Sequence, residues 1–250
     1  MKIAAPGSLC PRFSWGFFAV LAASAGLCSA SCEPGVATPV PEPPTLNLAR
    51  VGPPAMESTA QPLNGVHIYG LSGAAPSGAL VRVTNLDGTD PPSTVNVQPD
   101  GSFDVVVNVT SGQELRFDWL RGAERGEPQD ARFITMPSPF HLEPSQRFDC
   151  VKLTPGFSVD FGLALTQTLL VENECASSIT LAAPRARLGL PDFALETALP
   201  IDIEPGLETT LGLTFTRAQT TAREDTLFFD VTRDGVAIRY PITLLAPAAP

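Results

Sequence analysis

The sequence contains very little lysine and histidine. Lys2 and Lys152 are its only lysines, and His67 and His141 are its only histidines. With 16 Lys and Arg residues against 26 Asp and Glu residues, the formal net charge is −10. An acidic chain of this kind repels phosphate backbones, so we expect no nucleic-acid partner. We interpret the acidity as a property that keeps an exported domain in solution, with an acidic ligand-binding surface as the alternative.

The patterns of common catalytic sites are also missing. A zinc site needs about four convergent ligands, and two isolated histidines do not supply them. No Gly-x-Ser-x-Gly elbow is present, and the kinase-like motif Asp160–Gly162 lacks the Gly-rich and catalytic loops of a kinase. We expect Phe161 to be structural and the protein not to be an enzyme, with no metal and no cofactor. A hydrolase of unrecognised type is the alternative, and it would need a pocket that joins a histidine to a serine or an acid.

One loop is rich in oxygen ligands. Asn85, Asp87 and Asp90 lie within six residues of one another, and calcium favours carboxylate and amide oxygens. The loop lacks full EF-hand spacing, and Asn and Asp next to Gly also form ordinary turns. The sequence therefore leaves open whether this loop binds calcium.

The N-terminus carries a short apolar run and no membrane-spanning one. Trp15–Leu27 is apolar and uncharged, but it is shorter than the ~20 residues that cross a bilayer. Lys2 and Arg12 precede it, and small residues follow it. This order is typical of a secretory signal peptide.

The residues that follow resemble the lipobox of bacterial lipoproteins. Ser29–Cys32 reads Ser-Ala-Ser-Cys, and the resemblance implies cleavage before Cys32 and acylation of its thiol. The family prefers leucine where Ser29 stands, and Cys28 fits less well because bulky Leu27 precedes it. Ordinary cleavage after Ser31 or the residue before it, giving a soluble periplasmic protein, is the alternative.

The residue after the acylated cysteine suggests a destination. In some Gram-negative bacteria an aspartate at this position retains a lipoprotein in the inner membrane, and here the residue is Glu33. The resemblance therefore implies a cell-envelope protein, anchored in the outer membrane in preference to the inner one.

The cysteines agree with export. The chain has five, namely Cys10, Cys28, Cys32, Cys150 and Cys175. The first two leave with the signal peptide and the third takes the lipid. The remaining pair predicts a Cys150–Cys175 disulfide in an oxidising compartment. Two buried free cysteines are the alternative.

Composition divides the chain into four parts. We expect a signal peptide at 1–31, a Pro-rich tether at 32–62, and two domains at 63–137 and 145–250. The chain holds 26 prolines, which favour turns and linkers over long helices. Within the tether, residues 45–51 alternate and predict an early strand. Pro137–Pro139 is taken as the boundary between the two domains.

Both domains show the two-residue period of β-strands. Alternating runs occupy Leu80–Asn85, Ser102–Val109, Leu115–Trp119, Thr168–Val171, Ile179–Leu181, Leu199–Ile203, Leu211–Phe215, Leu227–Val231 and Ile238–Ile242. Asp-Gly pairs separate several of them and favour tight turns. Phe228 and Phe229 must fall on opposite faces of one strand. We expect both to pack within the protein, with one exposed contact as the alternative. The sequence thus predicts an all-β protein with two immunoglobulin-like β-sandwich modules.

Residues 150–246 resemble the Hydin-type, choice-of-anchor-like immunoglobulin modules of bacterial surface proteins. The motifs occur in the family's order: Leu153–Pro155, Val159–Gly162, Val171–Asn173, Ile203–Gly206 and Leu213–Thr216. The loop after Gly162 is shorter than usual, so the edge strand there departs from the pattern. Related lipoproteins often place one cysteine before the first strand and another after the asparagine, and Cys150 and Cys175 match those positions.

Residues 64–136 are similar to bacterial Ig-like or carboxypeptidase-regulatory-like modules. The segments that match are Gly70–Gly78, Val81–Asn85 and Asp100–Phe103. These families imply binding, spacing or adhesion, with the membrane as one partner through the lipid anchor and a protein or glycan as a possible other. A subunit of a surface complex is a further alternative, and it would show an exposed edge strand or an apolar patch.

Overall fold

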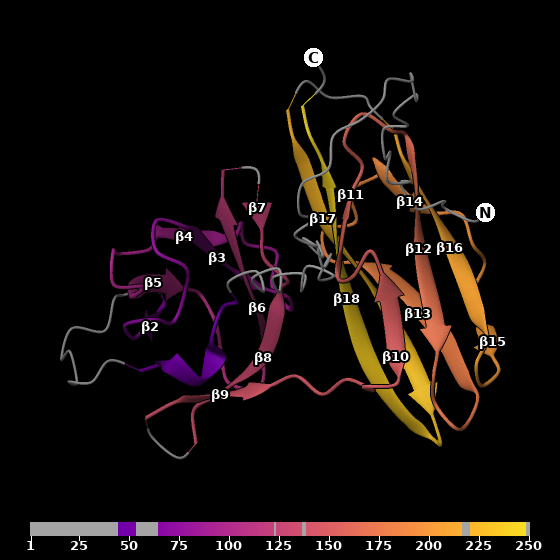
Figure 1. Ribbon diagram of the computed structural model, residues 1–250, viewed down its shortest axis with the longest axis horizontal. Helices are drawn as coiled ribbons and strands as arrows, with labels where there is room; N and C mark the ends of the chain where they lie inside the picture. Colours follow the sequence, from indigo (N-terminus) through magenta and orange to yellow (C-terminus); the bar gives the residue numbers. More distant parts are fainter. Residues whose placement is uncertain (1–44, 54–64, 123, 137–138, 217–220, 249–250) are drawn as a thin grey trace, which may run out of the picture. The chain divides into compact units, whose positions relative to one another are not determined.

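In the computed structural model, the described residues form two β-sandwiches (Figure 1). It describes residues 45–53, 65–122, 124–136, 139–216 and 221–248. Every described residue belongs to one compact unit, which spans residues 42–250. We call residues 45–144 module 1 and residues 145–248 module 2. The predicted signal peptide and Cys32 lie outside the described residues.

Module 1 consists of two antiparallel sheets. The first has the order β1-β2-β5, built from β1 (Val51–Gly52), β2 (Val66–Gly70) and β5 (Phe103–Val107). The second has the order β4-β3-β6-β8-β9, built from β4 (Ser93–Asn96), β3 (Leu80–Asn85), β6 (Glu114–Arg121), β8 (Gln129–Ile134) and β9 (His141–Pro144). A short strand, β7 (Glu124–Arg125), pairs with β6.

The alternation predicted from the sequence forms the core of module 1. On β6, Leu115, Phe117 and Trp119 are fully buried and meet valines from β3 and β5 in one cluster. Each buried Phe or Leu contributes roughly 1.5–3 kcal/mol through removal from water. The intervening β6 residues Arg116 and Asp118 point to the outer face of the sheet, and they are buried too.

Module 2 has the strand order of an immunoglobulin-like sandwich. One sheet runs β10-β12-β16-β14, from β10 (Val151–Thr154), β12 (Thr166–Asn173), β16 (Glu208–Phe215) and β14 (Phe193–Leu195). The other runs β11-β18-β17-β13-β15, from β11 (Ser158–Asp160), β18 (Val236–Ala246), β17 (Arg223–Arg233), β13 (Ile179–Ala186) and β15 (Ile201–Ile203). The first strand, β10, pairs with β12 in the first sheet. The chain then continues into β11, which pairs in parallel with the last strand, β18, of the second sheet. The all-β, two-sandwich prediction is confirmed.

The hairpin at Arg233–Gly235 contains one of the Asp-Gly pairs expected to form tight turns, and it joins the two longest strands, β17 and β18. Arg233 lies opposite Val236, and Asp234 and Gly235 both have positive φ, 51° and 80°. These are the requirements of a type I′ turn, whose twist matches that of the strands. In Figure 1 the pair forms the long yellow strands of module 2.

The adjacent phenylalanines of β17 are both buried, as expected. Phe229 belongs to the core of module 2. Phe228 lies on the opposite face, where the guanidinium carbons of Arg185 and Arg239 stand 5.1 Å and 4.9 Å from its ring centroid. The prediction of core plus sheet packing therefore holds, and the second ring is not an exposed contact.

The predicted tether 32–62 extends too far at its described residues. Leu46 is only 1% exposed and belongs to the core of module 1. The following residues form a 3-10 turn, η1 (Leu48–Arg50), and then β1, which pairs with β2. Of the early strand expected at 45–51, only Val51 lies in a strand, and residues 48–50 form this turn. Residues 45–52 belong to the module because Leu46 and Val51 fill its core.

The predicted module boundary at Pro137–Pro139 is also wrong. Strand β9, beyond it, pairs with β8 and places Phe133 opposite Leu142. The Phe133 and Phe140 rings lie 4.8 Å apart. Module 1 therefore extends to Pro144. No helix among the described residues is long and apolar enough to cross a membrane.

Candidate functional site

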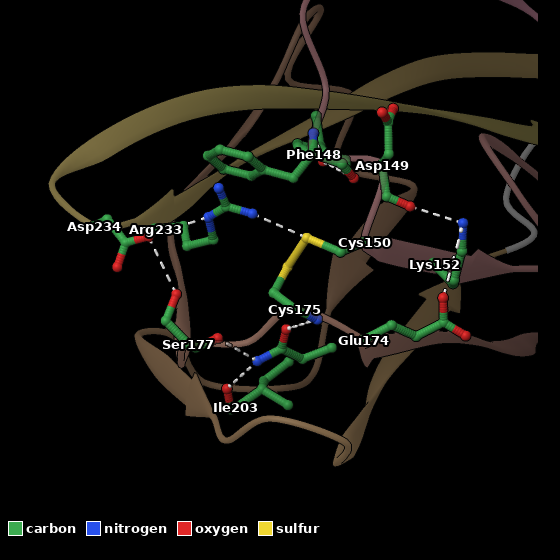
Figure 2. The surroundings of a disulfide bond; sticks show 12 residues. Phe148, Asp149, Cys150, Lys152, Glu174, Cys175, Ser177, Ile203, Arg233 and Asp234 are labelled. Carbon is green, nitrogen blue, oxygen red and sulfur yellow. Dashed lines mark hydrogen bonds and ion pairs between the residues drawn. A yellow bond between two sulfur atoms is a disulfide. The ribbon is translucent and has the colours of Figure 1, made fainter.

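A disulfide lies at the start of module 2, next to its first strand (Figure 2). Cys150 immediately precedes β10, and Cys175 follows β12, which pairs with β10. Their sulfur atoms are 2.04 Å apart and their Cα atoms 4.8 Å apart. The backbone N–H of Glu174 also donates to the Cys150 carbonyl at 2.8 Å. The structure therefore contains the disulfide that the sequence predicts.

A buried asparagine shapes the chain beside this disulfide. Asn173 is wholly buried, and its Nδ2 donates to the carbonyls of Ser177 and Ile203 at 3.0 Å and 2.8 Å. Its Oδ1 accepts from the N–H of Cys175 at 2.9 Å. Because a buried amide is stable only when it is hydrogen-bonded, these three bonds explain an asparagine at the end of β12.

An arginine covers the exposed side of the disulfide. Nη1 of Arg233 lies 3.1 Å from Cys150 Sγ, and its guanidinium carbon stands 4.8 Å from the Phe148 ring centroid. Figure 2 shows Arg233 between Phe148 and the two sulfur atoms. Cys175 is 5% exposed. The arrangement shields the bond and offers no open reactive thiol.

A buried region rich in charged side chains lies between the outer faces of the two modules. It contains Arg116, whose Nε and Nη2 donate to the two carboxylate oxygens of Asp130 at 2.7 Å and 2.8 Å. Nη2 also donates to the Pro241 carbonyl, and Nη1 to Thr243 Oγ1, both at 2.7 Å. Strand β6 of module 1 is thereby bonded directly to strand β18 of module 2. We call this region the arginine junction and include in it Arg82, Arg116, Arg187 and Arg239 with their partners.

The buried acid of the junction is held ionised. Burial disfavours the carboxylate of Asp130, but the adjacent Arg116 and Arg147 outweigh burial and lower its pKa. Arg147 Nη2 lies 2.5 Å from Asp130 Oδ2, and its guanidinium carbon lies 3.5 Å from the Phe157 ring centroid. Asp130 therefore takes part in two ion pairs at once.

A second pair of strands adds to the junction. Arg82 of β3 pairs with Asp118 of β6 at 3.0 Å and with Glu224 of β17 at 2.5 Å. Burial alone would lower the pKa of Arg82, but its two acidic partners raise it. A third arginine, Arg239 of β18, pairs with Asp87 at 2.5 Å and with Glu114. The junction therefore combines these ion pairs with ring contacts, since Arg147 stands over Phe157 and Arg239 over Phe228.

The possible calcium loop belongs to this junction. Asp87 Oδ1 pairs with Arg239, and Asp87 Oδ2 accepts from the N–H of Glu114. Asn85 uses its side chain for Asn108, Gln113 and Asp87. Arg187 donates to the carbonyls of Asn85 and Asp90. Protein donors already engage these oxygens, and no group of metal-ligating side chains occurs among the described residues.

The histidines stand in separate surface pairs. His67 Nδ1 lies 2.9 Å from Asp104 Oδ1, and His141 Nε2 lies 3.3 Å from Glu143 Oε1. Neither histidine lines the pocket described below. Phe161 of the kinase-like motif is 1% exposed and packs 5.7 Å from the Phe215 ring centroid. Its structural role is confirmed.

A pocket of about 690 Å³ opens next to the junction. Its walls come from the β6–β7 hairpin and residues 126–128 of module 1, and from β11, β17 and the end of β18 of module 2. Acidic Glu124, Glu127, Asp160 and Glu224 and basic Arg125 and Arg223 line it. Four acids against two arginines leave the wall with an excess of negative charge.

The sequence predicted neither the junction nor the pocket. Arg116 and Asp118 occupy the outward positions of β6, which alternation alone assigns to solvent. The structure places Arg82 directly opposite Asp118, and Arg116 directly opposite Asp130. Opposite charges at facing positions of adjacent strands could have indicated the junction. Recognising them requires knowledge of which residues pair across the strands.

No family model and no curated protein matches this chain. Among solved structures, the VesB protease of Vibrio cholerae is 9% identical over 68% of this chain and 62% of its own, with a TM-score of 0.36. The CsuC–CsuE chaperone–tip adhesion subunit complex of Acinetobacter baumannii gives 16% identity, 36% and 48% coverage, and a TM-score of 0.30. The D0–D1 domain of intimin is 11% identical over 73% of this chain and 90% of its own, with a TM-score of 0.26. The chain spans less than two thirds of the first two, and TM-scores this low carry no argument about function.

Proposed function

We propose that this chain is a non-enzymatic lipoprotein of the cell envelope that acts as a binding, spacer or adhesion-type module. Cys32 is the proposed point of attachment to the membrane, with the outer membrane favoured by Glu33. The partner beyond the membrane is a protein or a glycan. In this proposal the two sandwiches work as one body at the end of the Pro-rich segment.

The arginine junction is the observation that carries the proposal. Two modules connected only by a flexible linker would move independently, which is the default for adjoining domains. Here Arg116 bonds across from β6 to β18, and Arg82 from β3 to β17. A force applied to one module, by a load or by a bound partner, is then transmitted to the other module, as a spacer or adhesion module requires.

The disulfide supports a location outside the cytoplasm. Structural disulfides persist in oxidising compartments and are rare where thiols are kept reduced. The Cys150–Cys175 bond is partly buried and covered by Arg233, as suits a structural bond. A soluble periplasmic protein of the same fold would share this feature, so the anchor itself has to be tested.

Membrane fractionation of a Cys32→Ser variant tests the proposal. We expect the unaltered chain in the membrane fraction, with a lipid mass on its N-terminal peptide, and the variant released or retained as an uncleaved precursor. Stable anchoring takes two or more acyl chains, at ~0.8 kcal/mol for each buried CH₂. A Cys28→Ser variant is the matched control and should fractionate like the unaltered chain. Unchanged membrane association of Cys32→Ser, without a lipid mass on the peptide, would contradict the proposal.

A further inference from the structure

The wall of the pocket includes an open edge of a β-sheet. Strand β11 is the outermost strand of its sheet and pairs on one side only, in parallel with β18. The N–H of Phe161 and the carbonyl of Phe157 bond to β18 at 2.8 Å and 2.9 Å. In a parallel pair, alternate residues bond to the same neighbour. The backbone groups of Ser158 and Asp160 therefore face away from β18.

These same residues line the pocket. Ser158 and Asp160 both contribute to its wall. No described residue accepts from or donates to Ser158 Oγ, although this hydroxyl is buried. The Asp160 carbonyl accepts one bond from Gln167 Nε2 at 3.1 Å. The edge thus presents unpaired backbone and hydroxyl groups beside a cavity, and a buried polar group without a partner is costly.

The charge of the pocket is unevenly compensated. Glu224 pairs with Arg82 outside the wall, Glu124 pairs with Arg121, and Arg125 pairs with Asp118. Glu127 and Asp160 form no direct ion pair with any described residue. The Glu127 carboxylate lies beside Gly156, two residues before β11. Two carboxylates without a direct cationic partner therefore flank the open strand edge.

We propose that β11 binds an extended peptide segment of a partner protein, with a basic side chain of that segment entering the pocket. The peptide adds a strand to the open edge, and its main chain pairs with Ser158 and Asp160. An arginine or lysine placed between Glu127 and Asp160 supplies the missing positive charge. Specificity follows from this side chain, because main-chain pairing alone accepts many sequences.

The Pro-rich segments of this chain are poor candidates for the same place. Residues 32–44 and 54–64 contain no lysine and no arginine. They cannot supply the positive charge that the wall lacks, and their prolines cannot donate to a strand edge. Charge therefore favours a separate basic partner.

Labelled peptides and the purified full-length chain in detergent test the inference. The probe is an octapeptide in which threonine alternates with valine around a central arginine, and the comparison peptide carries glutamate at that position. We expect the arginine peptide to bind at least tenfold more tightly by fluorescence anisotropy. Hydrogen exchange of the Ser158 and Asp160 amides should slow at least tenfold when it is bound. An arginine peptide that is N-methylated on alternate residues should not bind.

Two variants separate the site from general charge attraction. Glu127→Lys should weaken binding of the arginine peptide at least tenfold. Glu208→Lys changes the total charge equally at an exposed position outside the pocket and should leave binding unchanged. Glu127→Gln should give an intermediate loss. Equal binding of the two peptides, equal effects of the two lysine variants, or no protection of β11 would each overturn the inference. The inference rests on the proposed binding role and makes it more specific. Its failure would not change the expected result of the membrane fractionation of Cys32→Ser.

Discussion

Arg116 and Asp130 face each other across strands β6 and β8 and form a bidentate ion pair that is almost completely buried. Their side chains are 2% and 0% exposed. Both residues occupy the face of the sheet that looks away from the core of module 1. The remaining donors of Arg116 reach Pro241 and Thr243 of module 2. One arginine thus holds together two strands of one module and joins them to the next.

Removal of Arg116 should destabilise the protein strongly. In an Arg116→Met variant the carboxylate of Asp130 stays buried and keeps only Arg147. Breaking a buried ion pair from one side costs about 3–5 kcal/mol. A loss of about 3 kcal/mol lowers the melting temperature of a domain of this size by at least about 6 °C. Calorimetry and urea unfolding measure both quantities.

An exposed arginine provides the control for that experiment. Arg121 pairs with Glu124 on the surface, with side chains 45% and 42% exposed. Exposed pairs contribute about 0–1 kcal/mol, so Arg121→Met should scarcely change the midpoint. Equal effects of the two substitutions would show that the buried pair adds no stability beyond a surface pair.

Acid should weaken the junction. Burial opposes ionisation of Asp87, but its bonds from Arg239 and from the Glu114 N–H lower its pKa, and the pKa of Asp130 is lowered as well. A lowered folded pKa contributes stability that is fully present above the unfolded value of about 3.9. That stability is lost as the pH falls through the folded pKa. Asp118 acts in the opposite direction, because burial raises its pKa.

The pH dependence can be assigned to Asp87 by an isosteric variant. We expect the urea midpoint of the unaltered chain to decrease as the pH is lowered below about 4, and the midpoint of Asp87→Asn to decrease less steeply. Asp100→Asn is a useful comparison, because the pKa of Asp100 is lowered by Ser102 without any contact to an arginine. Its effect on the midpoint should not change when Arg239→Gln is introduced, whereas that of Asp87→Asn should diminish.

The disulfide should be present in exported protein and should stabilise module 2. Cys150 and Cys175 are separated by 25 residues, for which the chain-entropy account gives about 3.5 kcal/mol. The double variant with alanine at both positions should lose about that amount, with faster hydrogen exchange in β10 and β12 than in β6. Cys10→Ser, in the predicted signal peptide, is the control. Free-thiol labelling of both Cys150 and Cys175 in exported protein would contradict the bond.

Local patterns made part of this fold predictable. The turn at Arg233–Gly235 is specified by two residues, and the core face of β6 by alternate large apolar side chains. Asn173 at the end of β12 was anticipated through a family resemblance, and its three buried hydrogen bonds supply the physical reason. In each case the determinant lies within a few residues of the chain.

The remainder depended on pairing between distant residues. Alternation along β6 predicts that Arg116 is exposed to solvent. Its side chain is buried because Asp130 of β8 pairs with it and because β18 packs against it. Composition assigned Leu46 to the tether, because prolines surround it, although its side chain enters the core of module 1. The pocket requires β11 and β7, which are far apart in sequence and too short to give a clear period.

The close contact between Gly126 and Trp119 gives the last prediction. Gly126 follows β7, and its N–H donates to the Trp119 carbonyl at 3.0 Å. A Cβ atom at Gly126 would lie 2.0 Å from Nε1 and 2.3 Å from Cε2 of the Trp119 ring. The ring is fully buried in the core of module 1, so it has little room to move away. Gly126→Ala should therefore cost about 1–3 kcal/mol through overpacking.

Tryptophan fluorescence can follow this change directly. Trp15 and Trp119 are the only tryptophans, so a Trp15→Phe background leaves Trp119 as the single emitter. We expect Gly126→Ala to shift its emission to longer wavelength and to lower the melting temperature. Gly52→Ala is the matched control, because no atom lies within 4 Å of a Cβ built there, and it should remain within about 0.5 kcal/mol. An unchanged spectrum together with an unchanged melting temperature for Gly126→Ala would show that the ring is not held against this glycine.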